Sequence, residues 1–242
     1  MSSNPETDFG YRQVPTAAKK PMVRAVFDSV APRYDLMNDL MSLGVHRAWK
    51  RELVIGLDPR PGRTLLDLAG GTGDIAFGWR KRGGGPVLLS DINAAMLGVA
   101  RGRQVEGVRL LVADAEALPL PDGCVDRVSI AFGLRNCTDK AAVLREAWRV
   151  LRPGGQFHCL EFSRMQVAAL AGAYDAWSFK VLPRLGQMVA GDAESYTYLA
   201  ESIRTFPDQD ALAGMMQAAG LSRVRFRNLT GGIAAIHTGW RL

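Results

Sequence analysis

The chain has 242 residues, of which 48% are hydrophobic and 22% are charged, enough to bury one α/β core with decorations. The sequence contains no run of about 20 apolar residues, and its first ten residues are polar, so it predicts neither a membrane-spanning helix nor a secretory signal. The expected location is the cytoplasm. The formal net charge of +6 suits an anionic partner, either a nucleic acid or the inner face of a membrane, and equally a solvated basic surface.

Residues 1–20 are polar and predict a flexible N-terminal arm. A single domain is expected over residues 21–242. Its first part, residues 21–57, has apolar positions at helical spacing and predicts a helical cap of short helices, broken at Pro32 and Gly44.

Residues 63–162 alternate between short apolar runs and helical patterns, which predicts a doubly wound parallel sheet. The expected strands are residues 64–68, 87–90, 108–112, 125–132 and 156–160. Residues 163–206 predict a helical insertion, and residues 207–242 a C-terminal helix followed by two strands. The predicted fold is therefore α/β and Rossmann-like, with a mostly parallel seven-stranded sheet, N-terminal helices and a helical insertion before the last two strands.

The most informative stretch is residues 65–74, an apolar strand that runs into glycines and then into a helix. Gly71 and Gly73 allow a sharp turn and a close approach of a ligand, and the helix start offers unpaired N–H groups. Asp91 ends the second expected strand, where a carboxylate can accept hydrogen bonds from both hydroxyls of a ribose. The pattern predicts a nucleotide-like cofactor.

The glycines alone do not choose the cofactor, because Gly71, Thr72, Gly73 and Ala76 also fit the dinucleotide pattern. Three further features favour S-adenosylmethionine. The first is an acid inside the first strand, Asp67. The second is an acid that ends the third strand, Asp114, followed by the small residue Ala115. The third is the Leu-Arg-Pro-Gly-Gly step at residues 151–155, before the fifth strand. Asp114 is placed to accept from an adenine amino group, whereas Asp67 suits a loop anchor and a ligand contact equally well.

Four segments resemble the ubiquinone/menaquinone biosynthesis C-methyltransferase family (UbiE/MenG). They are FDSVAPRYDLMND at 27–39, LDLAGGTGD at 66–74, FGLRN at 132–136 and YLAESI at 198–203. The resemblance runs from about residue 10 to the C-terminus. It implies a class I methyltransferase that transfers a methyl group from S-adenosylmethionine to a ring carbon of a polyprenylated quinol. The substrates implied are 2-polyprenyl-6-methoxy-1,4-benzoquinol, demethylmenaquinol, or both.

The resemblance also implies cofactor contacts at Thr72, Asp91, Asp114 and Ala115. The chain departs from the family at Ala131, where the family often has a serine.

Methyl transfer from a sulfonium is an in-line displacement, which requires alignment and exclusion of water but no metal. The nucleophilic carbon needs electron density from a neighbouring quinol oxygen, and a ring proton must leave afterwards. The candidate catalytic residues are Arg135, Asn136 and Tyr34. Arg135 is expected either to stabilise a quinolate oxygen or to form a salt bridge that shapes its loop. His46 is expected to be a helix residue with a structural partner.

The three cysteines are widely spaced and lack histidines at ligand spacing, so reduced thiols and no metal site are expected. The apolar stripe between residues 174 and 189 suits core packing, or a channel for a prenyl tail. The expected partner is a lipid-tailed quinol. Peripheral contact with the membrane or with a quinone-biosynthesis complex, and formation of a homodimer, are left open. No nucleic acid is expected, because no basic platform interleaved with aromatic residues is present. Three alternatives remain: methylation of RNA, methylation of another small molecule, and a cofactor-binding scaffold.

Overall fold

The computed structural model describes residues 6–30, 39, 42, 44–103, 105–166 and 193–242. Its centre is a seven-stranded sheet in the order β5-β4-β3-β6-β7-β9-β8. The strands are β3 (Leu65–Leu68), β4 (Val87–Asp91), β5 (Val108–Val112), β6 (Val125–Ala131), β7 (Leu151–Phe162), β8 (Ser222–Leu229) and β9 (Ala234–Trp240). Strands β3 to β7 pair in parallel, and β9 runs antiparallel to both of its neighbours. This confirms the predicted Rossmann-like, mostly parallel sheet.

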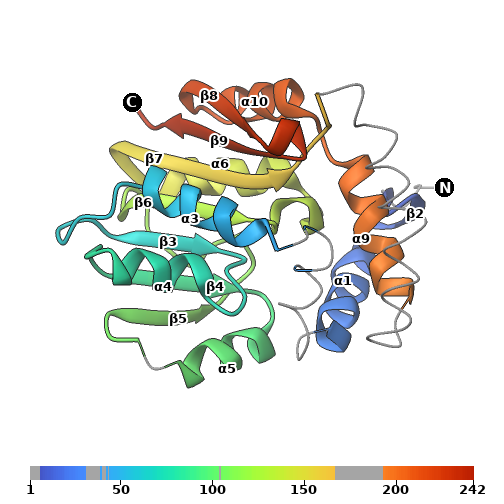
Figure 1. Ribbon diagram of the computed structural model, residues 1–242, viewed down its shortest axis with the longest axis horizontal. Helices are drawn as coiled ribbons and strands as arrows, with labels where there is room; N and C mark the ends of the chain where they lie inside the picture. Colours follow the sequence, from blue (N-terminus) through green and yellow to red (C-terminus); the bar gives the residue numbers. More distant parts are fainter. Residues whose placement is uncertain (1–5, 31–38, 40–41, 43, 104, 167–192) are drawn as a thin grey trace.

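Helices cover both faces of the sheet (Figure 1). Packed against one face are α3 (His46–Gly56), α4 (Asp74–Lys81) and α5 (Ala94–Gly102). Packed against the other are α6 (Lys140–Val150) and α10 (Gln209–Ala218). Because side chains alternate along a strand, Leu65 belongs to the first hydrophobic cluster and its neighbour Leu66 to the second.

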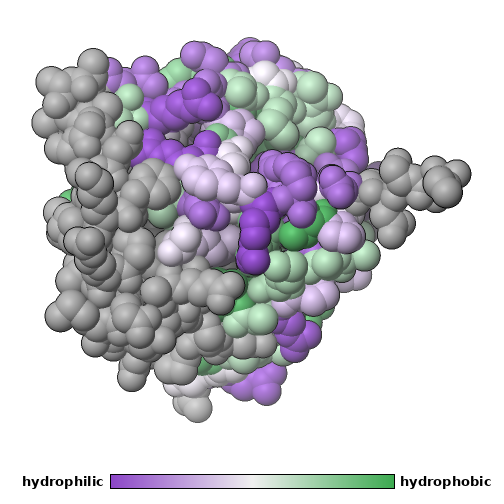
Figure 2. Space-filling model, turned by 90° about the vertical axis from the view of Figure 1, so that its right-hand side faces the viewer, coloured by the Kyte–Doolittle hydropathy of each residue, from purple (hydrophilic) through white to green (hydrophobic). Residues whose placement is uncertain are grey.

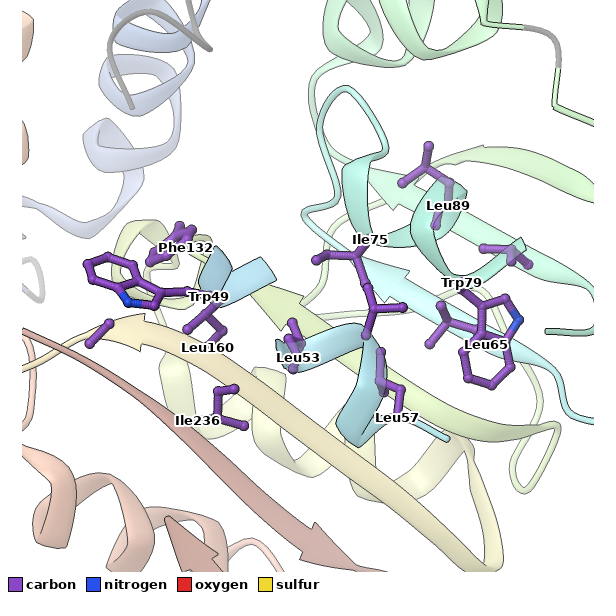
Figure 3. Close-up of a cluster of buried hydrophobic side chains, with 14 of the residues drawn as sticks. Trp49, Leu53, Leu57, Leu65, Ile75, Trp79, Leu89, Phe132, Leu160 and Ile236 are labelled. Carbon is purple, nitrogen blue, oxygen red and sulfur yellow. The ribbon is translucent and has the colours of Figure 1, made fainter. Parts of the chain in front are cut away.

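Helix α3 is held to the sheet by residues spaced four apart. Trp49, Leu53 and Leu57 point into the same cluster as Leu65 and Leu160 (Figure 3). Both leucines of this row are fully buried, and Trp49 is 4% exposed. Burying one such side chain contributes about 1.5–3 kcal/mol, so this row fixes the position of the helix.

The N-terminal segment differs from the predicted arm of residues 1–20. Residues 6–15 form a hairpin of β1 (Glu6–Phe9) and β2 (Arg12–Pro15), and α1 (Thr16–Val30) follows at once. Phe9 is buried and stacks on Tyr198 of α9 (Ala193–Thr205), with ring centroids 4.3 Å apart. This contact joins residues far apart in the sequence, so no local pattern could show it. The hairpin, α1 and α9 lie together at one end of the sheet (Figure 1).

The Leu-Arg-Pro-Gly-Gly step at residues 151–155, expected to precede the fifth strand, forms the first part of the long strand β7. Leu151 pairs with Val125 and Gln156 with Arg127, so the register shifts over this stretch. Of the predicted insertion 163–206, α9 is a helix, and the apolar stripe falls within residues 167–192, outside the described residues. Over the ranges that the structure describes, no helix has the length and apolar character needed to cross a bilayer.

Candidate active site

A cleft opens where the carboxyl ends of the parallel strands meet. Its empty volume, including the part open to solvent, is about 820 Å³. The loops after β3, β4, β5 and β6 contribute lining residues, and α1 closes one wall. The polar or charged side chains in the lining are Lys20, Arg24, Asp91, Asn93, Asp114, Glu116, Asn136 and Thr138. Ligands of open α/β sheets bind at this edge, so the position of the cleft matches the predicted cofactor site.

The loop after β3 is shaped by glycines at positions that would strain or crowd any other residue. Gly71 and Gly73 have φ angles of 55° and 89°, in the left-handed region. A Cβ at Gly73 would lie 2.7 Å from Phe77, and a Cβ at Gly70 would lie 2.3 Å from Leu89. The loop therefore packs tightly against the protein, while its Gly71 side lines the cleft.

Asp91 ties the glycine loop to the end of β4. Its Oδ2 accepts a hydrogen bond of 2.8 Å from the backbone N–H of Gly71, and its Oδ1 accepts one of 2.8 Å from Asn93. Burial raises the pKa of Asp91, and these backbone donors oppose the rise. Each oxygen keeps a lone pair for another donor, and the side chain lines the cleft as predicted.

Asp114 and Ala115 also line the cleft, at the end of β5. Asp114 Oδ1 accepts from the Glu116 backbone at 3.0 Å, and Lys20 of α1 lies 2.5 Å from Oδ2. Lys20 also pairs with Glu116 at 2.8 Å. Burial lowers the pKa of Lys20, but its hydrogen bonds to these two carboxylates raise it overall. The ion pairs fix α1 against the cleft, and sequence reasoning missed Lys20 because it lies in the segment predicted to be an arm.

Asp67 has the contacts of a loop anchor. It is fully buried. Its Oδ1 accepts a 2.7 Å hydrogen bond from Ser129 Oγ, and its Oδ2 accepts one of 3.2 Å from the backbone N–H of Ala76. Burial raises its pKa to about 7 despite these donors. Asp67 and Thr72 border a second, small cavity beside the glycine loop, together with Lys50 of α3. The contacts fit the first of the two roles left open for Asp67.

Arg135 does not line the cleft. Its Nη1 lies 3.0 Å from Glu161 Oε2 and donates a 2.6 Å hydrogen bond to the carbonyl of Phe132, and its side chain is 1% exposed. The guanidinium also lies over the ring of Phe162, 5.5 Å from its centroid. Among the two roles expected for Arg135, this geometry is that of the salt bridge that shapes the loop after β6.

Asn136, the next residue, does line the cleft. Its Oδ1 accepts a 3.1 Å hydrogen bond from the hydroxyl of Tyr198, which orients the amide from α9. Tyr34 lies outside the described residues. His46 has the structural partner expected of it: its ring Nδ1 is 2.9 Å from Ser42 Oγ, and burial lowers its pKa.

The chain matches the model of the ubiE/COQ5 methyltransferase family over residues 15–241. It is 67% identical over 246 residues to a ubiquinone/menaquinone biosynthesis C-methyltransferase UbiE of Acidiphilium cryptum, with 100% of this chain and 99% of that protein covered. A protein of the same name from Caulobacter vibrioides is 52% identical over 252 residues, with 99% and 100% covered.

Solved structures resemble this chain in fold. A SAM-dependent methyltransferase from Thermotoga maritima superposes with a TM-score of 0.66 at 18% identity, covering 91% of this chain and 100% of its own. Phosphoethanolamine N-methyltransferase 2 of Haemonchus contortus, in complex with S-adenosyl-L-methionine, gives a TM-score of 0.62 at 13% identity, covering 80% and 52%. With the match over nearly its whole length, the chain belongs to the ubiE/COQ5 methyltransferase family.

Proposed function

We propose that this protein is a S-adenosylmethionine-dependent C-methyltransferase that methylates the ring of a polyprenylated quinol in ubiquinone or menaquinone biosynthesis. The observation that carries the proposal is the 67% identity over the full chain to a UbiE protein, combined with a cleft at the expected edge of the sheet. The substrates proposed are 2-polyprenyl-6-methoxy-1,4-benzoquinol, demethylmenaquinol, or both.

The residues around the cleft fit this cofactor. Gly71 of the glycine loop lines the cleft, and two carboxylates stand at successive strand ends with backbone donors already fixing their orientation. Asp91 would accept from the ribose hydroxyls and Asp114 from the adenine amino group, beside Ala115. Thr72, which borders the small cavity beside the glycine loop, stays a proposed cofactor contact, whereas Asp67 and Gly73 would act by holding the loop in shape. When bound, S-adenosylmethionine supplies an electrophilic methyl group.

The protein's own task is then to hold the quinol ring, orient its oxygen and exclude water. Asn136 is the described candidate for contact with the ring or its oxygen, since it faces the cleft and its amide is oriented by Tyr198. Arg135 would serve by positioning this loop through Glu161. Tyr34, in the N-terminal segment expected to cap the cleft, stays a proposed catalytic residue.

The partner proposed is a lipid-tailed quinol, which places the protein at the inner face of the membrane or in a quinone-biosynthesis complex, and allows a homodimer. The direct test is a strain that lacks this protein. Mass analysis should find quinones short of one ring methyl, restored by the intact gene and not by an Asp91→Ala version. Normal quinones in the deleted strain would overturn the proposal, and the identity of the accumulated species would choose between benzoquinol and naphthoquinol.

A further inference from the structure

A second hollow, outside the cleft, runs between α3 and α4. It is lined by His46, Arg47, Lys50, Arg51, Val54, Asp74, Gly78, Lys81 and Arg82. The two helices approach each other closely at Gly78, where a Cβ would lie 3.1 Å from Val54. We call it the α3–α4 groove.

The groove begins at the edge of the sheet that carries the cleft. Lys50 pairs with Asp74 at 2.8 Å, and one turn later Val54 contacts Gly78, so the two helices run in the same direction. Both start beside the glycine loop, and α4 ends with Lys81 (Figure 1). A ligand that binds along the groove would therefore reach the sheet edge that carries the cleft, where the proposed substrate must enter.

The groove is strongly basic. Five of its lining side chains are arginine or lysine: Arg47, Lys50, Arg51, Lys81 and Arg82. Its one acid, Asp74, is neutralised by Lys50 and by Arg103 at 2.9 Å. Partial burial raises the pKa of Asp74, but these two cations outweigh it and lower the value to about 2.

Three of the five cations have no role within the fold. Arg47 pairs with Asp39 and Lys50 with Asp74. By contrast the side chains of Arg51, Lys81 and Arg82 are exposed and make no ion pair or hydrogen bond with any residue in the described part of the chain. Unpaired cations concentrated in one hollow raise the local positive potential and attract phosphate groups.

The composition of the groove favours a lipid surface over RNA. None of its lining residues is Phe, Tyr or Trp, and the ring of His46 is only 3% exposed, so the groove offers no exposed ring on which a base could stack. One turn after Arg51, Ile55 exposes 47% of its surface, which places an apolar side chain next to the basic ones, as in helices that lie at a membrane interface. The proposed substrate carries a polyprenyl chain and resides in the bilayer.

We propose that the α3–α4 groove is a docking surface for the headgroups of anionic phospholipids, which brings the sheet edge to the membrane that holds the substrate. This inference rests on the proposed function. Its test, however, measures vesicle binding and not turnover, so the two can fail separately.

The full-length protein is floated with vesicles of phosphatidylcholine alone and with vesicles that include phosphatidylglycerol. Three forms are compared: wild type, the groove variant R51E/K81E/R82E, and a control variant R101E/R109E/R223E. The control makes the same change of charge at three other exposed arginines that have no ion pair among the described residues.

Wild type should bind only the vesicles with phosphatidylglycerol and be released by about 0.5 M salt, which screens such contacts. The groove variant should bind on the order of 100-fold more weakly, and the control less than fivefold more weakly. Both variants should methylate a short-chain, water-soluble quinol at the wild-type rate. If wild type does not methylate this quinol, the proposed function is refuted, but the vesicle result still stands.

The inference is overturned if wild type ignores phosphatidylglycerol, or if groove and control variants lose binding equally, since that would be a general effect of net charge. It is also overturned if a single-stranded RNA binds through the groove while vesicles do not.

Discussion

Arg135 and Glu161 form an ion pair in the interior of the protein, with 3.0 Å between Nη1 and Oε2 and both side chains 1% exposed. Glu161 also accepts from the backbone N–H of Arg135 at 3.2 Å. The pair links β7 to the short helical turn Leu134–Asn136, which carries Asn136 into the cleft. Figure 2 shows the side of the molecule that lies on the right in Figure 1. Among its coloured residues, hydrophilic and hydrophobic ones are interspersed.

Removing Arg135 should therefore act on the whole fold. Arg135→Ala leaves a buried carboxylate without its partner, and should lower the free energy of unfolding by about 3–5 kcal/mol. Cofactor affinity and single-turnover rate should fall with it, because the loop after β6 loses its anchor. Chemical denaturation, calorimetry and rapid quench on one preparation check this.

The double variant R135M/E161L is the control, because apolar side chains of similar size can replace a buried ion pair. It should regain most of the stability and much of the rate. A variant that is stable but remains about 100-fold slower would show instead that the guanidinium acts on the reaction itself.

Asp91→Ala should weaken S-adenosylmethionine binding by roughly 2–3 kcal/mol, because the ribose hydroxyls lose a charged acceptor. The same change frees the backbone N–H of Gly71 from a 2.8 Å hydrogen bond, so part of the loss comes from a looser glycine loop. Asp91→Asn, which keeps one carbonyl oxygen, should lose less. Titration calorimetry at constant salt measures both, and an unchanged affinity in Asp91→Ala would refute this placement of the cofactor.

Asp67 should make stability depend on pH. Its folded pKa of about 7 is above the ordinary value of 3.8, so the folded protein holds this proton more tightly than the unfolded chain does. The stabilisation is complete below pH 3.8 and is lost as pH rises to about 7. The change is on the order of 4 kcal/mol.

Urea unfolding of wild type and Asp67→Asn between pH 4 and pH 8 isolates this group, since every other titration is shared. The free energy of unfolding of wild type should fall relative to that of the variant across this range. Parallel curves would mean that Asp67 is ionised in the folded protein.

The mostly parallel sheet and the cleft at its edge were predictable because they follow from local signals. Alternating apolar runs specify the parallel core, and strand ends followed by Asp91 and Asp114 must meet at one edge. What the sequence did not reveal depends on contacts between distant residues. The stacking of Phe9 on Tyr198 and the pairing of Lys20 with Asp114 join segments about 190 and 94 residues apart. The sequence also did not identify the partner of Arg135, because nothing distinguishes Glu161 from the other acidic residues before the position of β7 is known.

Activity should survive EDTA, since displacement at a sulfonium needs alignment and an electron-rich carbon but no Lewis acid. Within the described ranges no group of three His, Cys, Asp or Glu side chains is arranged to hold a metal ion. Methyl transfer measured before and after exhaustive dialysis against the chelator should be equal. Loss of activity that Mg²⁺ restores would show that a metal takes part in the reaction.

Asn136 provides the sharpest test of the catalytic proposal. Asn136→Ala should lower the single-turnover rate by about 100-fold and change cofactor affinity less than twofold, because its contact is made with the reacting quinol. Tyr198→Phe keeps the ring that stacks on Phe9 and removes only the 3.1 Å hydrogen bond to the amide. It should slow the reaction by about fivefold, the equivalent of one ordinary hydrogen bond.

Tyr11→Phe is the matched control. Tyr11 is 58% exposed on the same hairpin as Phe9, so this substitution should leave the rate unchanged. If Tyr198 acts through Asn136, the double variant N136A/Y198F should be no slower than N136A alone, because the hydrogen bond has nothing left to orient. Additive losses would mean that Tyr198 acts on the reaction by another route. If Asn136→Ala proceeds at the wild-type rate, the catalytic group lies elsewhere, and Tyr34 becomes the next residue to change.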